Sequence, residues 1–119
     1  MQEISLVSFS GVFALRDGVS EQQFLPKLQA FFQHFIDVGF ATSYRVMRRE
    51  ALDDFGKTLP AFTYRGELIY PDMERERAAY EYVKQHGEPI NSLHVAMNSM
   101  VKPDADFFLE TRIELLPEQ

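Results

Sequence analysis

The sequence contains no cysteine and no tryptophan. The absence of cysteine excludes disulfide bonds, thiolate nucleophiles and cysteine-based zinc sites, so packing alone must hold the fold together. This fits a cytoplasmic protein, which is the compartment that we expect. The sequence also lacks an apolar stretch of the roughly 20 residues that a membrane span needs, and it lacks the basic start of a signal peptide. We therefore expect no membrane partner.

Positive charge is scarce as well, because 12 Lys and Arg stand against 18 Asp and Glu, for a net charge of −6. A nucleic-acid binder needs a basic face that neutralises phosphates, so we expect no nucleic-acid partner. Bulky apolar side chains are abundant, with 11 Phe and 5 Tyr. At 119 residues, without repeats or a linker, the chain is predicted to form a single domain over residues 1–119.

The first third of the chain predicts a strand followed by a helix. The apolar run Ile4–Leu15 is typical of a strand that is covered on both faces. Ser20–Val38 has helical spacing of its apolar residues, and Ser20 with Gln23 forms a capping-box pair at its start. Pro26 conflicts with a regular helix, so we expect either a distorted first turn or a later start.

The segment Phe40–Glu50 predicts a strand with two unlike faces. Side chains alternate across a strand, so Tyr44 and Val46 point to one face. Arg45 and Arg49 point to the opposite face. The strand therefore buries an apolar face against helices and presents arginines on the other side.

A polar loop over Ala51–Pro60 then leads to a third strand over Phe62–Tyr70. Asp72 is expected to cap a second helix that runs to His86 and stops at Gly87. The charged residues of this helix are expected to form a solvated surface: Glu74, Arg75, Glu76, Arg77, Glu81 and Lys84.

Pro89–Val101 fits both a helix with Pro89 in its first turn and an alternating strand, and we favour the helix. A last strand is predicted over Asp106–Leu115. The resulting order is the βαββαβ plan of a ferredoxin-like α+β sandwich with one extra short helix. Its helices cover one face of an antiparallel sheet, so the other face must meet water or a partner.

Three segments of the sequence resemble the dimeric α+β barrel superfamily. They are Arg16–Ser20, which precedes an aromatic-rich helix, Gly39-Phe40 and Ser43–Val46. That superfamily includes the antibiotic-biosynthesis-type monooxygenases, the EthD-like and NIPSNAP-like proteins and sugar mutarotases. Within it, the sequence is similar to an uncharacterised bacterial domain-of-unknown-function family at Arg48-Arg49, Leu59–Phe62 and Leu93–Val101. The resemblance implies a homodimer in which two sheets enclose a barrel. It transfers no catalytic residue.

Charged residues gather on the strand faces that lie opposite the large apolar side chains. If these faces line a barrel, arginines outnumber acids there, which favours an anionic ligand such as a carboxylate held by a guanidinium. The alternative is that the charges pair with one another across a dimer interface. The candidate ligand-binding residues on these faces are Arg45, Arg49, Arg65, Glu67, Glu110 and Arg112.

His94 and Asn98 are four residues apart, so they share a face of a helix. A neutral histidine beside an amide can act as a general base or orient a hydroxyl group. The alternative is that His94 hydrogen-bonds a neighbouring backbone group and fixes the helix on the sheet. Tyr44 and Tyr64 are further catalytic candidates, although aromatic residues on strands more often belong to the core.

We expect no metal and no cofactor, because His34 and His86 show no ligand spacing with each other or with His94. The sequence has no glycine-rich phosphate loop and no Ser/His/Asp or Cys/His arrangement. It thus predicts a homodimer that binds a small anionic or hydroxylated organic molecule between its sheets, and it leaves open whether a cofactor-independent reaction follows. The alternative is a non-catalytic structural or accessory dimer whose inner charges serve only the interface.

Overall fold

The computed structural model describes residues 6–50, 63–113 and 115, so the expected loop Ala51–Pro60 lies outside the described residues. The elements follow in the order β1 (Val7–Phe13), α1 (Glu21–Asp37), β2 (Ser43–Arg48), β3 (Tyr64–Tyr70), α2 (Met73–Lys84), α3 (Ile90–Asn98) and β4 (Asp106–Thr111). This is the predicted ferredoxin-like α+β order with the extra short helix. The choice of a helix over a strand for Pro89–Val101 is confirmed.

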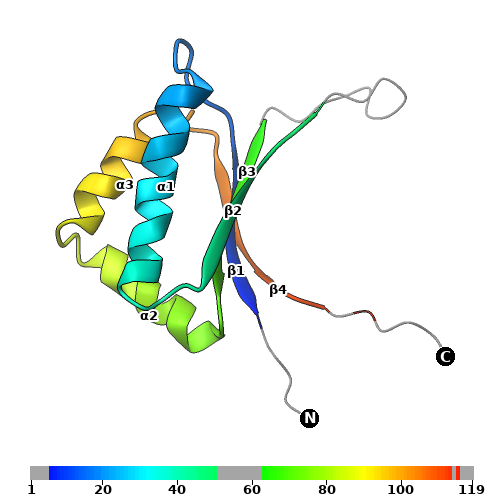
Figure 1. Cartoon of the computed structure of the whole chain (residues 1–119), viewed down its shortest axis with the longest axis vertical. Coiled ribbons are helices and arrows are strands. Elements are labelled where there is room, and N and C mark those ends of the chain that lie inside the picture. The colour runs from blue at the N-terminus through cyan, green and yellow to red at the C-terminus, as the bar shows by residue number, and fades with distance from the viewer. Residues whose placement is uncertain (1–5, 51–62, 114, 116–119) are drawn as a thin grey trace.

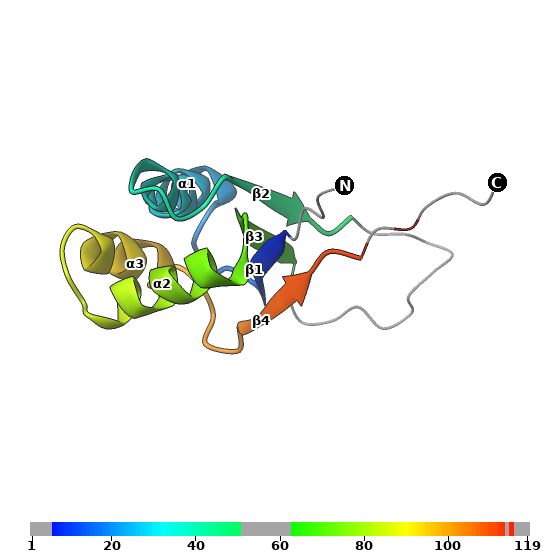
Figure 2. The same cartoon turned by 90° about the horizontal axis from the view of Figure 1, so that it is seen from below.

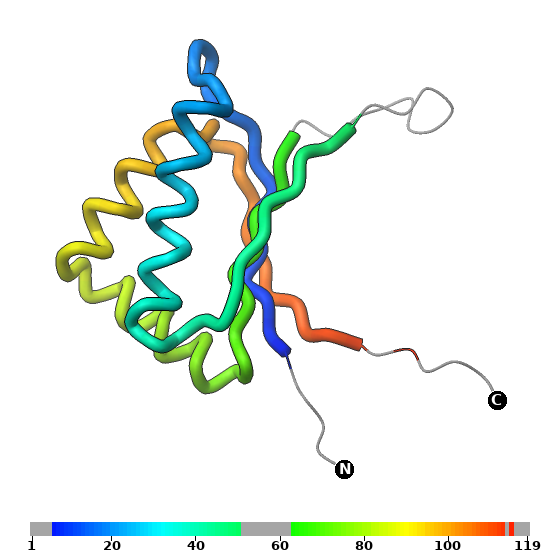
Figure 3. Tube along the Cα trace, viewed as in Figure 1, coloured from blue at the N-terminus to red at the C-terminus, as the bar shows by residue number. Residues whose placement is uncertain are grey.

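The four strands form one antiparallel sheet in the order β2-β3-β1-β4. All three helices lie on the same side of this sheet, and no described helix or strand covers its other side (Figures 1 and 2). We call the side without helices the open face. The trace in Figure 3 shows the same two layers. The described residues contain no helix that is long and apolar enough to span a membrane.

Helix α1 begins where its sequence signal predicts. Ser20 accepts a hydrogen bond from the Gln23 backbone N–H, and the Gln23 side chain accepts one from Ser20, which completes the capping box. The helix runs regularly from Glu21, so Pro26 lies inside it and the expectation of a later start is wrong. The capping box secures the first turn, and the helix keeps its start although Pro26 supplies no N–H of its own.

The core lies between α1 and the two central strands. Phe24, Leu28 and Phe35 of α1 are almost completely buried, and Leu68 of β3 lies in the same cluster. Phe24 packs on Phe13 of β1 with ring centroids 5.4 Å apart. Each such side chain contributes about 1.5–3 kcal/mol when it leaves water, so this apolar layer holds α1 on the sheet.

Helix α2 differs from the sequence expectation at its end and on one face. It ends at Lys84, and the left-handed residue beyond it is His86, with φ 56°, so Gly87 is not the stop residue that we expected. Glu76, expected in the solvated surface, is only 2% exposed. Glu76, Ala79 and Val83 are spaced by three and four residues, which places Glu76 on the inward face of the helix.

Candidate functional site

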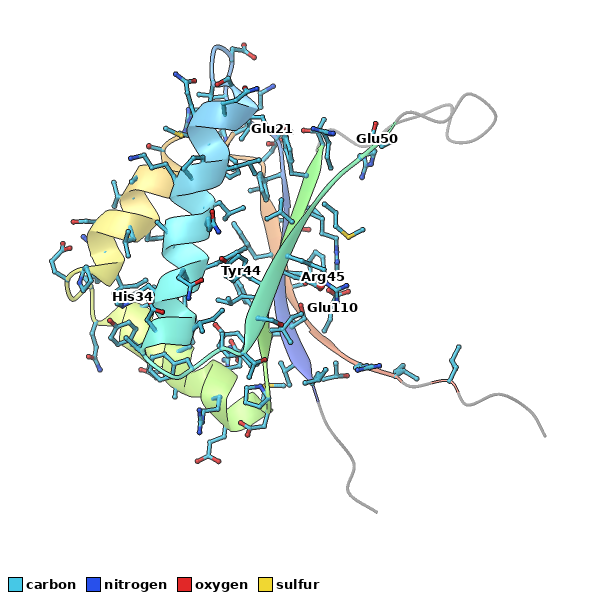
Figure 4. The ribbon with its side chains drawn as sticks, viewed as in Figure 1. Glu21, His34, Tyr44, Arg45, Glu50 and Glu110 are labelled. Atoms are coloured by element: carbon cyan, nitrogen blue, oxygen red, sulfur yellow. The ribbon has the colours of Figure 1, made fainter. Side chains whose placement is uncertain are left out.

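The sheet separates the sequence-predicted site residues into two groups. Figure 4 shows Tyr44 on the helix side of β2, whereas Arg45 and Glu110 lie on the opposite, open side. Alternation along β2 causes this split, because neighbouring side chains of a strand point to opposite faces. The two groups are therefore described in turn.

Glu67 lies at the centre of the open face. It is 7% exposed, and its carboxylate forms ion pairs with Arg45 and Arg65, the latter at 3.3 Å. Ser8 donates a further hydrogen bond to it at 3.0 Å. The antiparallel register explains the cluster, because Arg45 is the direct cross-strand partner of Glu67.

A second acid, Glu110 on β4, completes the network. It pairs with Arg65 and accepts a hydrogen bond from Ser10 at 2.6 Å. Arg45 and Arg65 therefore face two carboxylates with which they form ion pairs. The network lies in a groove of about 410 Å³ lined by Leu6, Val7, Ser8, Arg45, Arg65, Glu67, Ile69, Glu110, Thr111 and Arg112.

The other two arginines of the predicted ligand set lie beyond the ends of their strands. Arg112 follows β4, is exposed and lines the groove on the open face. Arg49 follows β2 and is also exposed. The structure thus brings Arg112 to the cluster of Arg45 and Arg65.

Tyr44 and Tyr64 point toward α1, where both hydroxyl groups have protein partners. The Tyr44 hydroxyl donates to the Gln33 side chain at 3.1 Å and accepts from Gln29 at 3.2 Å. Tyr64 donates to Glu21 at 2.9 Å, and Arg48 binds the same carboxylate at 2.8 and 2.9 Å. Both tyrosines therefore tie α1 to the sheet.

A cavity of about 190 Å³, which we call the inner cavity, lies between the sheet and the three helices. Its walls are mostly aromatic and aliphatic, with few polar groups, which is the usual composition of a small-molecule site. The residues that line it are Phe9, Phe31, Phe32, Phe35, Leu68, Tyr70, Glu76, Ala79, Tyr80, Val83 and His94.

Tyr70 contributes a hydroxyl group to this cavity. The residue is 3% exposed, and its hydroxyl has no hydrogen bond to any residue that the structure describes. Burial, with a smaller contribution from the Glu76 charge, raises the pKa of Tyr70 well above its usual value, so the phenol stays protonated. It is a polar group in an apolar wall, with which a ligand in the cavity could form a hydrogen bond.

His94 reaches the inner cavity from α3. Its ring packs on Phe31 with centroids 5.3 Å apart, and it has no hydrogen bond within the described part of the chain. The expected backbone anchor for this ring is therefore not found there. Burial first, and the nearby His86 second, lower the pKa of His94, which keeps the imidazole neutral at pH 7. A neutral imidazole can accept a proton.

His94 also lines a second hollow, between α2 and α3, which we call the outer groove. It measures about 430 Å³ and shares Tyr80, Val83 and His94 with the inner cavity. Asn98 lines the outer groove together with His94, as their spacing predicted. The outer groove and the inner cavity are therefore neighbours.

Glu76 is the site residue that sequence reasoning missed. Its carboxylate is bound by the neighbouring Arg77, at 2.5 Å through Nε and 2.7 Å through Nη2. The Arg77 guanidinium is half exposed and lies 4.9 Å from the centre of the Tyr80 ring. The spacing of Glu76 to Ala79 and Val83 is the sequence signal that could have placed it on the inward face.

His94 and the open-face arginines cannot act on one ligand within a single chain, because the sheet lies between them. His94, Tyr70 and Glu76 meet at the inner cavity, whereas Arg45, Arg65 and Glu110 meet on the open face. Among the described residues, no group of three or more His, Asp or Glu side chains is placed to hold a metal ion. The inner cavity is therefore the better candidate for chemistry, and the open face for contact with another surface.

Fold and site together define the class of protein, a ferredoxin-like α+β domain with an apolar cavity between its helices and one face of its sheet, and with no described helix or strand on the other face. Residues 6–109 match the family of unknown function DUF6614, so the chain belongs to that family. The comparison with curated proteins found no match.

Solved structures with the same fold include proteins described as enzymes and as dimers. SnoaB, a cofactor-independent oxygenase from Streptomyces nogalater, is 15% identical with a TM-score of 0.68, over 95% of this chain and 98% of that chain. The hydroxynitrile lyase from Passiflora edulis is 9% identical with a TM-score of 0.63, over 94% and 97%. A dimeric ferredoxin-like protein of unknown function from Thermobifida fusca is 10% identical with a TM-score of 0.58, over 92% and 93%. At these identities the likeness shows the fold alone.

Proposed function

We propose that the protein is a cytoplasmic homodimer that binds a small organic molecule in the inner cavity of each protomer, where His94 accepts a proton from it. One observation carries this proposal. The inner cavity is an apolar space in which the Tyr70 hydroxyl and the His94 ring have no hydrogen bond to a described residue. Binding sites commonly combine an apolar cavity with a few polar groups that converge on the ligand.

Cofactor-independent chemistry in this cavity would rest on His94. The lowered pKa leaves the ring as a base at neutral pH, and the Phe31 ring packs on one side of it. SnoaB is described as a cofactor-independent oxygenase, which supports the idea that this fold can carry such chemistry. This support is an analogy of fold, so it assigns no reaction.

The homodimer is proposed to form through the open face. This face carries the network of Glu67, Arg45 and Arg65 together with partly exposed apolar side chains such as Ile69. A sheet that helices cover on one side needs a second cover, and a second copy of the same face supplies one. The similar proteins from Thermobifida fusca and Bacteroides fragilis are described as dimeric, which favours this arrangement.

A second candidate function is a non-catalytic structural or accessory dimer. The ion pairs of the open face favour it, because Arg45 and Arg65 already bind Glu67 and Glu110 and need no anionic ligand to neutralise them. An anionic ligand between the sheets would have to displace these pairs. It would then be held by Arg45, Arg65 and Arg112 as the sequence suggested.

The test is a metabolite screen by thermal shift with three variants of the full chain. Ala79 is 1% exposed and lines the inner cavity, so Ala79→Phe places a ring in that space, whereas Ala78→Phe adds the same ring to an exposed position of α2. Arg45→Ala alters the open face alone. We expect ligand-induced stabilisation to disappear in Ala79→Phe and to persist in Ala78→Phe and Arg45→Ala.

The opposite pattern, with stabilisation lost in Arg45→Ala and kept in Ala79→Phe, would place the ligand between the sheets. A screen without any hit would favour the non-catalytic dimer. Sedimentation of each variant measures the dimer separately, and we expect all three to sediment as the unaltered protein does.

A further inference from the structure

The inner cavity has a charge opposite to the one that the sequence suggested for the ligand site. Glu76 is the only charged side chain among the described residues that line it. The residue is 2% exposed, so its carboxylate acts on the cavity with little screening by water. Arg77 offsets part of this charge, and the oxygens of the carboxylate still favour a ligand with hydrogen-bond donors or a positive charge over an anionic one.

The Glu76 carboxylate keeps room for such a ligand. Each of its oxygens accepts one hydrogen bond from Arg77, through Nε and Nη2. An ionised carboxylate offers about four acceptor positions, so about two stay available to donors from the cavity. Arg77 binds the Glu76 carboxylate from the exposed surface of α2, where the Arg77 guanidinium lies over the Tyr80 ring.

The rest of the cavity wall suits a ligand that has a positively charged group attached to an apolar part. Phe9, Phe31, Phe32, Phe35, Tyr70 and Tyr80 contribute six rings to the wall. Aromatic faces attract cations through their quadrupole, and walls of this kind recognise ammonium groups when an acid stands beside them. The Tyr70 hydroxyl oxygen and the neutral His94 ring supply further acceptors on the same wall.

The volume of the inner cavity limits the size of the ligand. The inner cavity measures about 190 Å³. A closed apolar cavity of about 150 Å³ holds one benzene molecule, so this cavity has room for one ring with a short side chain. A two-ring ligand would have to extend past His94 into the outer groove.

We propose that the inner cavity selects a protonated amine on a small apolar body, with the ammonium group on the Glu76 carboxylate and the body among the aromatic rings. This inference rests on the function proposed above and names its ligand class. Benzylamine, benzyl alcohol and benzoate are matched probes, because they share one ring and differ in the charge of the side group.

The experiment is calorimetric titration of the full chain with each of the three probes at pH 7. We expect benzylamine to bind at least tenfold more tightly than benzyl alcohol, and benzoate to bind most weakly. In Glu76→Gln the ratio between amine and alcohol should fall close to one, while the alcohol keeps its affinity within about threefold. Glu74→Gln, which removes the same charge from an exposed position of α2, should leave the ratio unchanged.

The outcomes separate this inference from the function on which it rests. If the alcohol binds as tightly as the amine in the unaltered chain, the amine proposal is overturned while the cavity remains a binding site. The amine proposal also fails if Glu76→Gln keeps the tenfold ratio. If no probe binds, or if all bind equally well to Ala79→Phe, the inner cavity itself is refuted as the site. The ratio in the unaltered chain decides the matter even if Glu76→Gln does not fold.

Discussion

The two faces of the sheet use polar groups in opposite ways. On the open face, Glu67, Arg65, Ser8 and Ser10 bind one another in a connected network. On the helix-covered face, the Tyr70 hydroxyl stands in an apolar wall without a partner in the described chain. Polar groups that bind their neighbours fix a structure, whereas a polar group without a protein partner can form a hydrogen bond with a ligand.

This difference teaches that the more charged face need not be the functional one. The arginines drew attention in the sequence because of their number, yet Arg45 and Arg65 are neutralised by acids of the same sheet. Among the described residues, Glu76 is the only charged side chain that lines the inner cavity. Six substitutions test the contrast between the two faces.

The largest effect is expected for Glu67→Ala on the open face. Glu67 is 7% exposed and binds two guanidinium groups, so its removal leaves Arg65 without its central partner. Arg65 keeps its pair with Glu110 and the Arg45 side chain is 64% exposed, so neither arginine is left buried without a partner, and we expect a loss of about 1.5–2 kcal/mol. Urea unfolding at fixed protein concentration measures it.

The matched control for that variant is Arg45→Ala. The Arg45 side chain is 64% exposed, and Glu67 keeps Arg65 when Arg45 is removed. We expect a loss below about 1 kcal/mol. Equal losses in the two variants would show that the network is not centred on Glu67.

The next prediction compares Tyr70, whose hydroxyl has no described hydrogen bond, with Tyr44, whose hydroxyl has two. Tyr70→Phe removes a hydroxyl that has no described hydrogen bond and is not fully closed off from water, so we expect no loss of stability. Tyr44→Phe removes two hydrogen bonds to α1, so we expect a loss of about 1 kcal/mol. The same unfolding assay measures both, and a loss in Tyr70→Phe would mean that its hydroxyl is already satisfied.

A smaller effect is expected from the titration of His94. Its folded pKa lies below the ordinary value of 6.5, so the unfolded chain binds this proton first as the pH falls. The contribution of His94 to stability is therefore present above pH 6.5 and decreases as the pH falls through 6.5 toward the folded pKa. In His94→Gln, stability should decline less between pH 7.5 and 5 than in the unaltered chain. Parallel curves would contradict the burial of this ring.

The smallest effect concerns Glu21 at the start of α1. Hydrogen bonds from Arg48 and Tyr64 lower its pKa from 4.5. Its contribution to stability is present above pH 4.5 and is lost as the pH falls through the lower folded pKa. We expect Glu21→Gln to flatten the acid limb of the stability curve slightly, because the pair is exposed and screened. Acid titration followed by circular dichroism tests this, and an unchanged limb would contradict it.

The fold was largely predictable from the sequence because its signals are local. Alternation placed Tyr44 and Arg45 on opposite faces, and the capping box located the start of α1. The stop of α2 was missed because the helix ends early and His86, rather than Gly87, adopts the left-handed conformation. The effect of Pro26 on the helix was overestimated. Pro26 removes one backbone N–H, whereas the packing of α1 on the sheet supplies most of the stability of the helix.

The site was predictable only in part, because it depends on distances across the fold. His94 was identified from its spacing to Asn98, and both line the outer groove. The inner cavity could not be foreseen, since its volume is set by how three helices sit on the sheet. Glu76 was assigned to the surface with its charged neighbours, although its spacing to Ala79 placed it inward.

The most direct test of the account is a nuclear magnetic resonance titration of the labelled full chain, with benzylamine and separately with benzyl alcohol. The account predicts that the ring signals of His94 and Phe31 shift with ligand, while the Nε–H signals of Arg45 and Arg65 stay in place. Shifts of the two arginine signals without a change at His94 would contradict it, because the ligand would then lie on the open face.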